Sequence, residues 1–139
     1  MALNKAYNQY KENSIYTATP EELTLMLYNG IIRFVMQAQV FIDDRNIEKA
    51  NNSIIRAQDI IHEFQRSLDM KYEVSQGLAS MYDYMNSRLI EANMHKDKDI
   101  LQEVLNFAKE LRDTWAQAMK TAKLQNRPHK MAGQEAENI

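Results

Sequence analysis

The stretch "EELTLMLYNGIIRFVMQAQVFI", from Glu21 to Ile42, contains 14 apolar residues among its 22. After Glu22, Arg33 is its only charged residue. A helix that packs on one side of a soluble bundle needs apolar residues at only about three positions in seven. The stretch is therefore apolar over more of its circumference than packing against one core requires.

The surplus falls on a second side of the expected helix. At about 100° per residue, the expected core stripe is Leu23, Leu27, Gly30 with Ile31, Phe34, Ala38 and Phe41. The opposite side, where a bundle meets water, carries Leu25, Tyr28, Ile32, Met36 and Val40. Burying such a row contributes on the order of 1.5–3 kcal/mol per large side chain, and leaving it exposed favours aggregation. We therefore expect another subunit, the protein's own first residues or a partner peptide to cover the row.

Two interpretations of the outward row stay open. Smaller apolar positions outside the expected core, at Ile55, Tyr72 and Ile90, raise the same question on the next two helices. In the first interpretation, the bundle is less regular than a helical wheel and the N-terminal segment packs permanently over the row. In the second, the row forms a groove for an amphipathic helix of a partner.

The composition is that of a soluble globular domain. The 139 residues are 45% apolar and 26% charged, with a formal net charge of −2, which fits one domain with its own core. Without a basic excess, the chain lacks the charge that nucleic-acid binding needs. The absence of cysteine excludes disulfides and thiolate metal sites and suits a reducing cytoplasm. The N-terminus has no apolar stretch typical of a secretory signal, and polar residues interrupt 20–43, so we expect neither secretion nor membrane insertion.

The hydrophobic period is helical throughout, with breaks at "DDRN", "DMK" and "HKDKD". It predicts four helices at about 20–43, 47–68, 74–92 and 101–122. Beyond the first helix, the expected core residues are Ile47, Ala50, Ile54, Ala57, Ile61, Phe64 and Leu68, then Val74, Leu78, Met81, Met85, Leu89 and Ala92, and last Leu101, Val104, Ala108, Leu111, Trp115, Ala118 and Ala122. Asp97 or Asp99 is the expected cap of the fourth helix. Thr19, Pro20 and Glu22 form the start signal of the first helix. Short connections and heptad-like spacing favour an all-α, antiparallel up-down-up-down four-helix bundle.

Outside residues 19–123, which should form the bundle, the pattern changes. The N-terminal leader, 1–18, is aperiodic yet contains aromatic residues such as Tyr7 and Tyr10. Aromatic residues in such a leader suit a segment that lies on another surface. The end of the chain, 124–139, is polar and contains proline and glycine, which predicts a flexible tail.

No pattern of residues marks a catalytic or metal site. Asp59 and His62 lie one helical turn apart, but di-iron bundles with such a pair need a second pair and two further inward glutamates. "HEFQR" has Arg66 where a zinc-protease helix needs histidine, and "DKDI" lacks the glycine of a calcium loop. We therefore expect no enzyme, no metal and no cofactor.

Tyr82 and Tyr84, in "MYDYM", allow two roles. They could fill the core, where each hydroxyl needs a hydrogen-bond partner. They could also join an adaptable docking surface of the kind that methionine supplies, and the chain has nine methionines. The candidate binding residues are therefore Tyr7, Tyr10, Leu25, Tyr28, Ile32, Met36, Val40, Ile55, Tyr82 and Tyr84.

Six short motifs together resemble the FliS family of flagellar export chaperones. They are "AY" at 6–7, "TATPEEL" at 17–23, "LYNG" at 27–30, "MYDYM" at 81–85, "RLIEAN" at 88–93 and "LRDTW" at 111–115. Their order and spacing agree with the family over roughly residues 6–120. The tail after this region matches nothing in the family pattern.

The resemblance implies a cytoplasmic chaperone that binds the disordered C-terminal segment of new flagellin. Such a chaperone prevents premature polymerisation and presents flagellin to the flagellar type III export apparatus, so flagellin and export gate components are the implied partners. The resemblance implies no cofactor and no covalent chemistry. It also implies that the segment around Tyr7 and Tyr10 covers part of the client site in a free, monomeric or weakly dimeric chaperone. The alternative is a self-associating structural bundle with no client.

Overall fold

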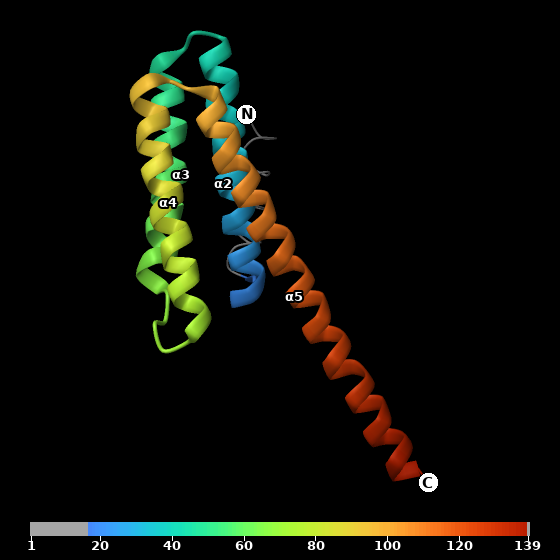
Figure 1. Cartoon of the computed structure of the whole chain (residues 1–139). Helices are drawn as coiled ribbons and strands as arrows, with labels where there is room; N and C mark the ends of the chain where they lie inside the picture. The colour runs from blue at the N-terminus through green and yellow to red at the C-terminus, as the bar shows by residue number, and fades with distance from the viewer. Residues whose placement is uncertain (1–16, 139) are drawn as a thin grey trace. The chain divides into compact units, whose positions relative to one another are not determined.

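Four helices make up most of the described part of the chain (Figure 1). The computed structural model describes the backbone of residues 17–138 and the side chains of residues 17–125. The helices are α2 (Pro20–Asp43), α3 (Ile47–Ser67), α4 (Glu73–His95) and α5 (Lys98–Asn138). No strand occurs in residues 17–138, and the predicted all-α class is confirmed.

The chain divides into two compact units. One is Leu27–Arg112, which contains most of α2, all of α3 and α4, and the first part of α5. The other combines the chain up to Met26 with the chain from Asp113. Most of the candidate binding residues lie in Leu27–Arg112.

Side-chain caps begin both α2 and α3. The Thr19 hydroxyl accepts a hydrogen bond from the backbone N–H of Glu22 at 3.1 Å, so the predicted cap of α2 is confirmed. The side-chain oxygen of Asn46 accepts one from the backbone N–H of Lys49, also at 3.1 Å. Each bond satisfies a backbone donor that has no partner inside the helix.

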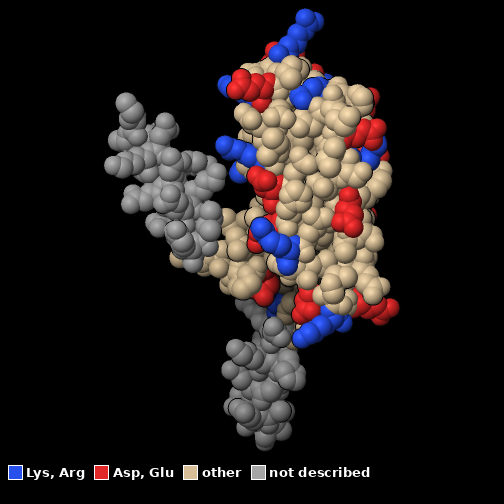
Figure 2. Space-filling model, turned by 90° about the vertical axis from the view of Figure 1, so that its left-hand side faces the viewer, with Lys and Arg blue, Asp and Glu red and all other residues tan. Residues whose placement is uncertain are grey.

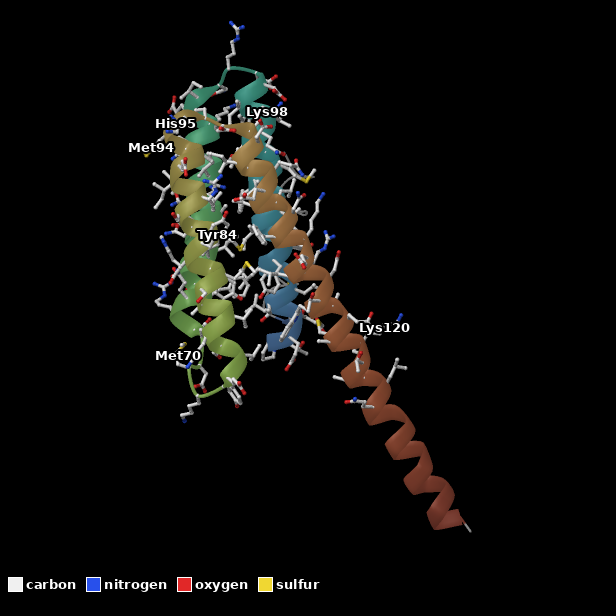
Figure 3. All side chains as sticks on the ribbon, in the orientation of Figure 1. Met70, Tyr84, Met94, His95, Lys98 and Lys120 are labelled. Carbon is white, nitrogen blue, oxygen red and sulfur yellow. The ribbon has the colours of Figure 1, made fainter. Side chains whose placement is uncertain are left out.

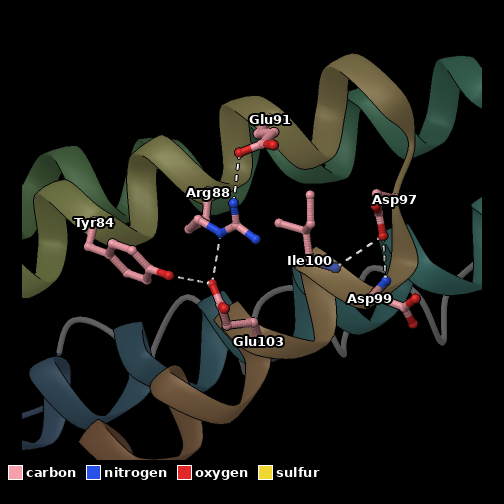
Figure 4. A network of polar contacts seen from close by, with 7 residues as sticks. All are labelled: Tyr84, Arg88, Glu91, Asp97, Asp99, Ile100 and Glu103. Carbon is pink, nitrogen blue, oxygen red and sulfur yellow. Dashed lines mark hydrogen bonds and ion pairs between the residues drawn. The ribbon is translucent and has the colours of Figure 1, made fainter.

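The turn from α4 to α5 combines a left-handed residue with an aspartate cap. Lys96 has φ of 49° and its backbone N–H bonds to the carbonyl of Ala92, which ends α4. The Asp97 carboxylate then accepts hydrogen bonds from the backbone N–H groups of Asp99 at 2.8 Å and Ile100 at 3.2 Å (Figure 4). Of the two aspartates that the sequence offers as the cap, Asp97 takes the role.

Contacts between side chains show that α2 and α3 run antiparallel. The guanidinium of Arg56 lies over the Phe34 ring, and the ammonium of Lys49 lies over the Phe41 ring. Positions therefore rise along α2 while they fall along α3. The three residues between the two helices, 44–46, are too few for any other direction.

Three hydrogen bonds between polar side chains, here called the polar ladder, show that α3 and α4 also run antiparallel. The hydrogen bonds are Asn93 to Asn51 at 2.8 Å, Gln58 to Asn86 at 3.1 Å and Gln65 to Asp83 at 2.7 Å. Each donor and acceptor would lose hydrogen bonds if the helices slipped by one turn. The ladder therefore favours one register over its neighbours.

Polar contacts also join α5 to both α4 and α2. Arg88 on α4 donates to Glu103 at 2.8 Å, and Lys98 at the start of α5 pairs with Asp43 at the end of α2 at 2.6 Å. Each helix within Leu27–Arg112 thus contacts the next, and α5 contacts α2. The predicted up-down-up-down bundle is confirmed.

The core-facing side of α2 differs from the predicted stripe. The buried side chains are Tyr28, Ile31, Ile32, Val35 and Ala38. Leu23 is instead 38% exposed, and Phe34 and Phe41 are only half-buried. Both sides of this helix are apolar, so the helical wheel had no polar face from which to fix the inward direction.

The other helices follow their predicted stripes more closely. The predicted residues that are buried on α3 are Ala50, Ile54, Ala57, Ile61 and Phe64, and on α5 they are Leu101, Val104 and Ala108. On α4, Met85, Leu89 and Ala92 are buried as predicted. Ile47 and Val74 are 51% and 67% exposed, contrary to the prediction, because each lies in the first turn of its helix. Ala118 and Ala122 of α5 are exposed as well.

The last helix is longer than the sequence predicts. The periodic pattern ends near residue 122, but α5 continues to Asn138 and includes Pro128. Residues 121–125 are all exposed. The structure thus differs from the sequence prediction in the length of this helix, and the prediction of a flexible tail stays a prediction.

Helix α2 is also long and apolar enough to cross a membrane, by length and composition alone. The polar residues in it do not lower its hydropathy below that of a span, contrary to the expectation from sequence. A core helix of a soluble protein passes the same test. Six residues of α2 are buried inside the protein, which fits a core helix.

Candidate functional site

An open apolar hollow lies on the outward side of α2 within Leu27–Arg112. It has a volume of about 430 Å³ and is lined by Asn29, Ile32, Arg33, Met36, Gln37, Val40 and Phe41. Met36 is 48% exposed and Val40 is 57% exposed. Exposed aliphatic side chains around a hollow are typical of a surface that another chain covers.

The predicted outward row of α2 is only partly outward. Met36 and Val40 are exposed as predicted, but Tyr28 and Ile32 are 4% and 7% exposed. The prediction that these two side chains face water was wrong. In a bundle each helix packs against two neighbours, so an arc wider than one stripe is covered. Ile32 borders both the core and the hollow.

Tyr28 and Tyr82 belong to a buried aromatic stack. The Phe64 ring lies between them, with ring centroids 4.6 Å from Tyr28 and 5.3 Å from Tyr82. The two phenolic oxygens are 2.7 Å apart and hydrogen-bonded. Burial raises the pKa of both tyrosines above the ordinary value of 10.0, so both stay neutral. Of the two roles that the sequence allows Tyr82, the structure shows the core role.

Tyr84 lies on the other side of α4, beside α5 (Figure 3). It is 44% exposed, its ring packs edge-on against Phe107 with centroids 5.7 Å apart, and its hydroxyl donates to Glu103 at 2.9 Å. Arg88 donates to the same carboxylate and to Glu91 (Figure 4). The bonds from Arg88 and then Tyr84 lower the pKa of Glu103. These contacts join α4 to α5 and hold Tyr84 away from the α2 hollow.

Ile55 is an exposed residue of α3 and does not line the α2 hollow. Ile55, Ile90 and Met94 are 43%, 47% and 73% exposed, and Met94 points away from the bundle (Figure 3). Figure 2 shows that the side of the molecule at the left of Figure 1 has charged side chains of both signs around a stretch without charge. The structure therefore does not bring Ile55 together with the hollow on α2.

The unit that includes Asp113 contains Leu25. Leu25 lines a smaller hollow of about 230 Å³ with Ala116, Met119, Lys120 and Lys123. In the same unit, the Trp115 indole Nε1–H donates to the Glu21 carbonyl at 2.9 Å. Leu25 is thus half-buried beside α5 residues. Tyr7 and Tyr10, the remaining candidates, lie outside the described residues.

Cations lie over two aromatic rings of α2, which the hydrophobic period does not predict. Arg33 and Arg56 flank Phe34, and Lys49 lies over Phe41. No signal in the sequence marks these pairs, because they depend on the register between α2 and α3. Within the described residues, no group of three or more His, Cys, Asp or Glu is placed to hold a metal ion.

Comparison with known proteins gives the family. A family model described as flagellar protein FliS matches residues 3–122. The chain belongs to the FliS family.

Several relatives are named flagellar secretion chaperone FliS. The protein from Bacillus subtilis (strain 168) is 42% identical over 121 residues, covering 87% of this chain and 91% of the relative. The protein from Campylobacter jejuni is 34% identical over 117 residues, covering 83% and 91%. The protein from Escherichia coli (strain K12) is 31% identical over 111 residues, covering 78% and 82%. These relatives are named as chaperones and not as enzymes.

The motifs that carry the likeness to FliS make internal contacts. "LYNG" supplies Tyr28 and "MYDYM" supplies Tyr82, and these two hydroxyls bond in the core. "RLIEAN" supplies Arg88, which joins α4 to α5, and "LRDTW" supplies the indole of Trp115. The α2 hollow lies mostly between these FliS motifs, at residues 29–41.

Proposed function

We propose that this FliS-family protein is a cytoplasmic chaperone for flagellin. It binds the disordered C-terminal segment of flagellin, prevents premature polymerisation and presents the client to the flagellar type III export apparatus. Membership of the FliS family and the names of the relatives support this proposal. The observation that carries the site is the apolar hollow on α2, with Met36 and Val40 exposed beside it.

The physical requirements of such a client agree with this surface. A disordered segment that folds on binding pays roughly 2–5 kcal/mol for its ordering. Burying a large apolar side chain returns on the order of 1.5–3 kcal/mol. A few aliphatic side chains on each partner therefore offset the ordering cost without making release slow.

The leader has a place in this proposal. We propose that the segment around Tyr7 and Tyr10 covers part of the client site until flagellin binds. Hydrogen exchange at residues 4–16 should then change when the flagellin segment is added. Equal protection with and without the segment would count against a covering role.

Titration calorimetry with the flagellin C-terminal segment tests the site. Val40→Asp places a charge beside the hollow and should weaken binding at least tenfold, since an unpaired carboxylate resists burial. Val74→Asp is the matched control, because Val74 is 67% exposed and Val40 is 57% exposed. It should bind as the unaltered protein does. Ile32 is unsuitable for this test, since its substitution would also disturb the core.

Two results would contradict the proposal. One is the absence of any heat of binding to the flagellin segment; the other is equal affinity of the two aspartate variants. Light scattering distinguishes the proposed chaperone from the alternative, a self-associating bundle with no client. If exposed Val40 serves a homodimer, mass should rise with protein concentration and Val40→Asp should abolish the rise.

A further inference from the structure

Three cations lie over aromatic rings of α2: Arg33 of α2 itself, and Lys49 and Arg56 of α3. Arg33 lies over the Phe34 ring at 5.1 Å from the ring centroid, and Arg56 lies over the same ring at 5.7 Å. Lys49 lies over the Phe41 ring at 5.7 Å. Arg33 and Phe41 line the hollow itself. Lys49 therefore lies over a ring that lines the hollow, and Arg56 shares the Phe34 ring with an arginine that lines it.

None of the three cations has a carboxylate partner in the part of the chain that the structure describes. Arg66 pairs with Glu63, Arg88 with Glu91 and Glu103, and Lys98 with Asp43. Among the described residues, the recorded partners of these three cations are aromatic rings. A ring orients a cation through its quadrupole but leaves the positive charge un-neutralised. No carboxylate of the described residues thus neutralises their charge.

The two pairs between helices are regularly spaced. Phe34 and Phe41 are seven residues apart on α2, and Arg56 and Lys49 are seven residues apart on α3. Seven residues are about two helical turns, or roughly 10 Å along the axis. Carboxylates at positions i and i+7 of another helix have the same separation.

We propose that the client helix which occupies the α2 hollow carries carboxylates two turns apart along its edge toward α3. These carboxylates pair with Lys49 and Arg56, while the apolar stripe of the client covers Met36 and Val40. The inference rests on the proposed function and adds a requirement to it, here called the charge rule: the client helix carries carboxylates two turns apart. The apolar stripe supplies affinity, and the carboxylates fix the direction and register of the client.

Two synthetic peptides test the charge rule with the full-length protein. Both are amphipathic helices with the same leucine stripe. One has glutamates seven residues apart at one edge of the stripe, and the other has glutamines there. Calorimetry at low salt should show the glutamate peptide binding about three- to tenfold more tightly. The difference should shrink at high salt, because exposed pairs are screened.

The double variant Lys49→Gln with Arg56→Gln should bind both peptides equally. Lys71→Gln is the matched control, since Lys71 is an exposed lysine in the turn between α3 and α4, and it should keep the preference. Equal affinities in the unaltered protein, a preference that survives in the double variant, or no binding of either peptide would overturn the inference. Binding of the flagellin segment is measured separately. A protein that binds flagellin but treats both peptides alike overturns only the charge rule.

Discussion

The phenolic oxygens of Tyr28 and Tyr82 lie 2.7 Å apart on helices that do not follow one another in the chain. Tyr82 is 2% exposed and Tyr28 is 4% exposed, and no buried side-chain polar atom lacks a partner among the described residues. Each hydroxyl therefore satisfies the other across the core. The pair ties α2 to α4, the diagonal neighbours of the bundle.

Removing one hydroxyl of this pair should lower the free energy of unfolding by more than removing both hydroxyls does. Tyr82→Phe leaves the Tyr28 hydroxyl buried without a partner and should lower the free energy of unfolding by about 1–3 kcal/mol. The double variant Tyr28→Phe with Tyr82→Phe leaves no unpaired group and should be closer to the unaltered protein. Urea unfolding measures all three. A double variant less stable than Tyr82→Phe alone would contradict this account.

The same pair predicts loss of stability in alkali. Burial raises the pKa of both tyrosines in the folded state above the ordinary value of 10.0. Above about pH 10, unfolded tyrosines release protons that the folded pair retains. The contribution of the two tyrosines to the free energy of unfolding is therefore complete below that pH and is lost as the pH rises above it.

Urea unfolding followed from neutral pH to about pH 11 tests this dependence. The decline should be shallower in the double phenylalanine variant, which has no buried hydroxyl to ionise. An equally steep decline in both proteins would assign the effect to other groups.

The two helical glycines of the bundle should respond differently to substitution. A Cβ at Gly30 would lie 2.9 Å from Cδ1 of Ile60, whereas a Cβ at Gly77 would meet nothing within 4 Å. Gly77→Ala should stabilise the protein by roughly 0.5–1 kcal/mol through helix propensity. Gly30→Ala should gain less, because the Ile60 methyl must turn aside. Thermal unfolding compares the two, and a larger gain at Gly30 would contradict the close approach of α2 and α3.

The sequence predicts the core-facing side of α3 better than that of α2, and the reason is physical. On α3, Ala50, Ile54 and Ala57 belong to one apolar stripe, most of the other positions are polar, and all three residues are buried. On α2 apolar residues occupy nearly the whole circumference, so periodicity alone does not tell whether Phe34 or Val35 points inward. Val35 is fully buried, because packing against neighbouring helices makes that choice.

The candidate site was predicted in part for the same reason. Met36 and Val40 were identified as exposed apolar residues, since they fall outside any plausible core stripe. The helical wheel places Tyr28 on the outward side, and periodicity gives no sign of its buried hydrogen-bond partner, Tyr82, on another helix. The cations at Lys49 and Arg56 depend on which residue of α3 faces which ring of α2, and a single sequence does not specify that register.

The end of α5 should be dispensable for stability. The family match ends at residue 122, and residues 121–125 are all exposed, so a chain ending at residue 123 should unfold at the same temperature. A chain ending at Asp113 loses the Trp115 hydrogen bond to the Glu21 carbonyl. That shorter chain should unfold at a lower temperature. A marked loss of stability on removing only residues 124–139 would contradict this expectation.

The central claim is that the outward face of α2 receives the flagellin segment, and methyl NMR tests it most directly. Titration with the flagellin C-terminal segment should shift the methyl signals of Met36 and Val40. The methyl signals of Val74, which is exposed on α4, should stay in place. Saturating binding that leaves the Met36 and Val40 signals unchanged would contradict the claim.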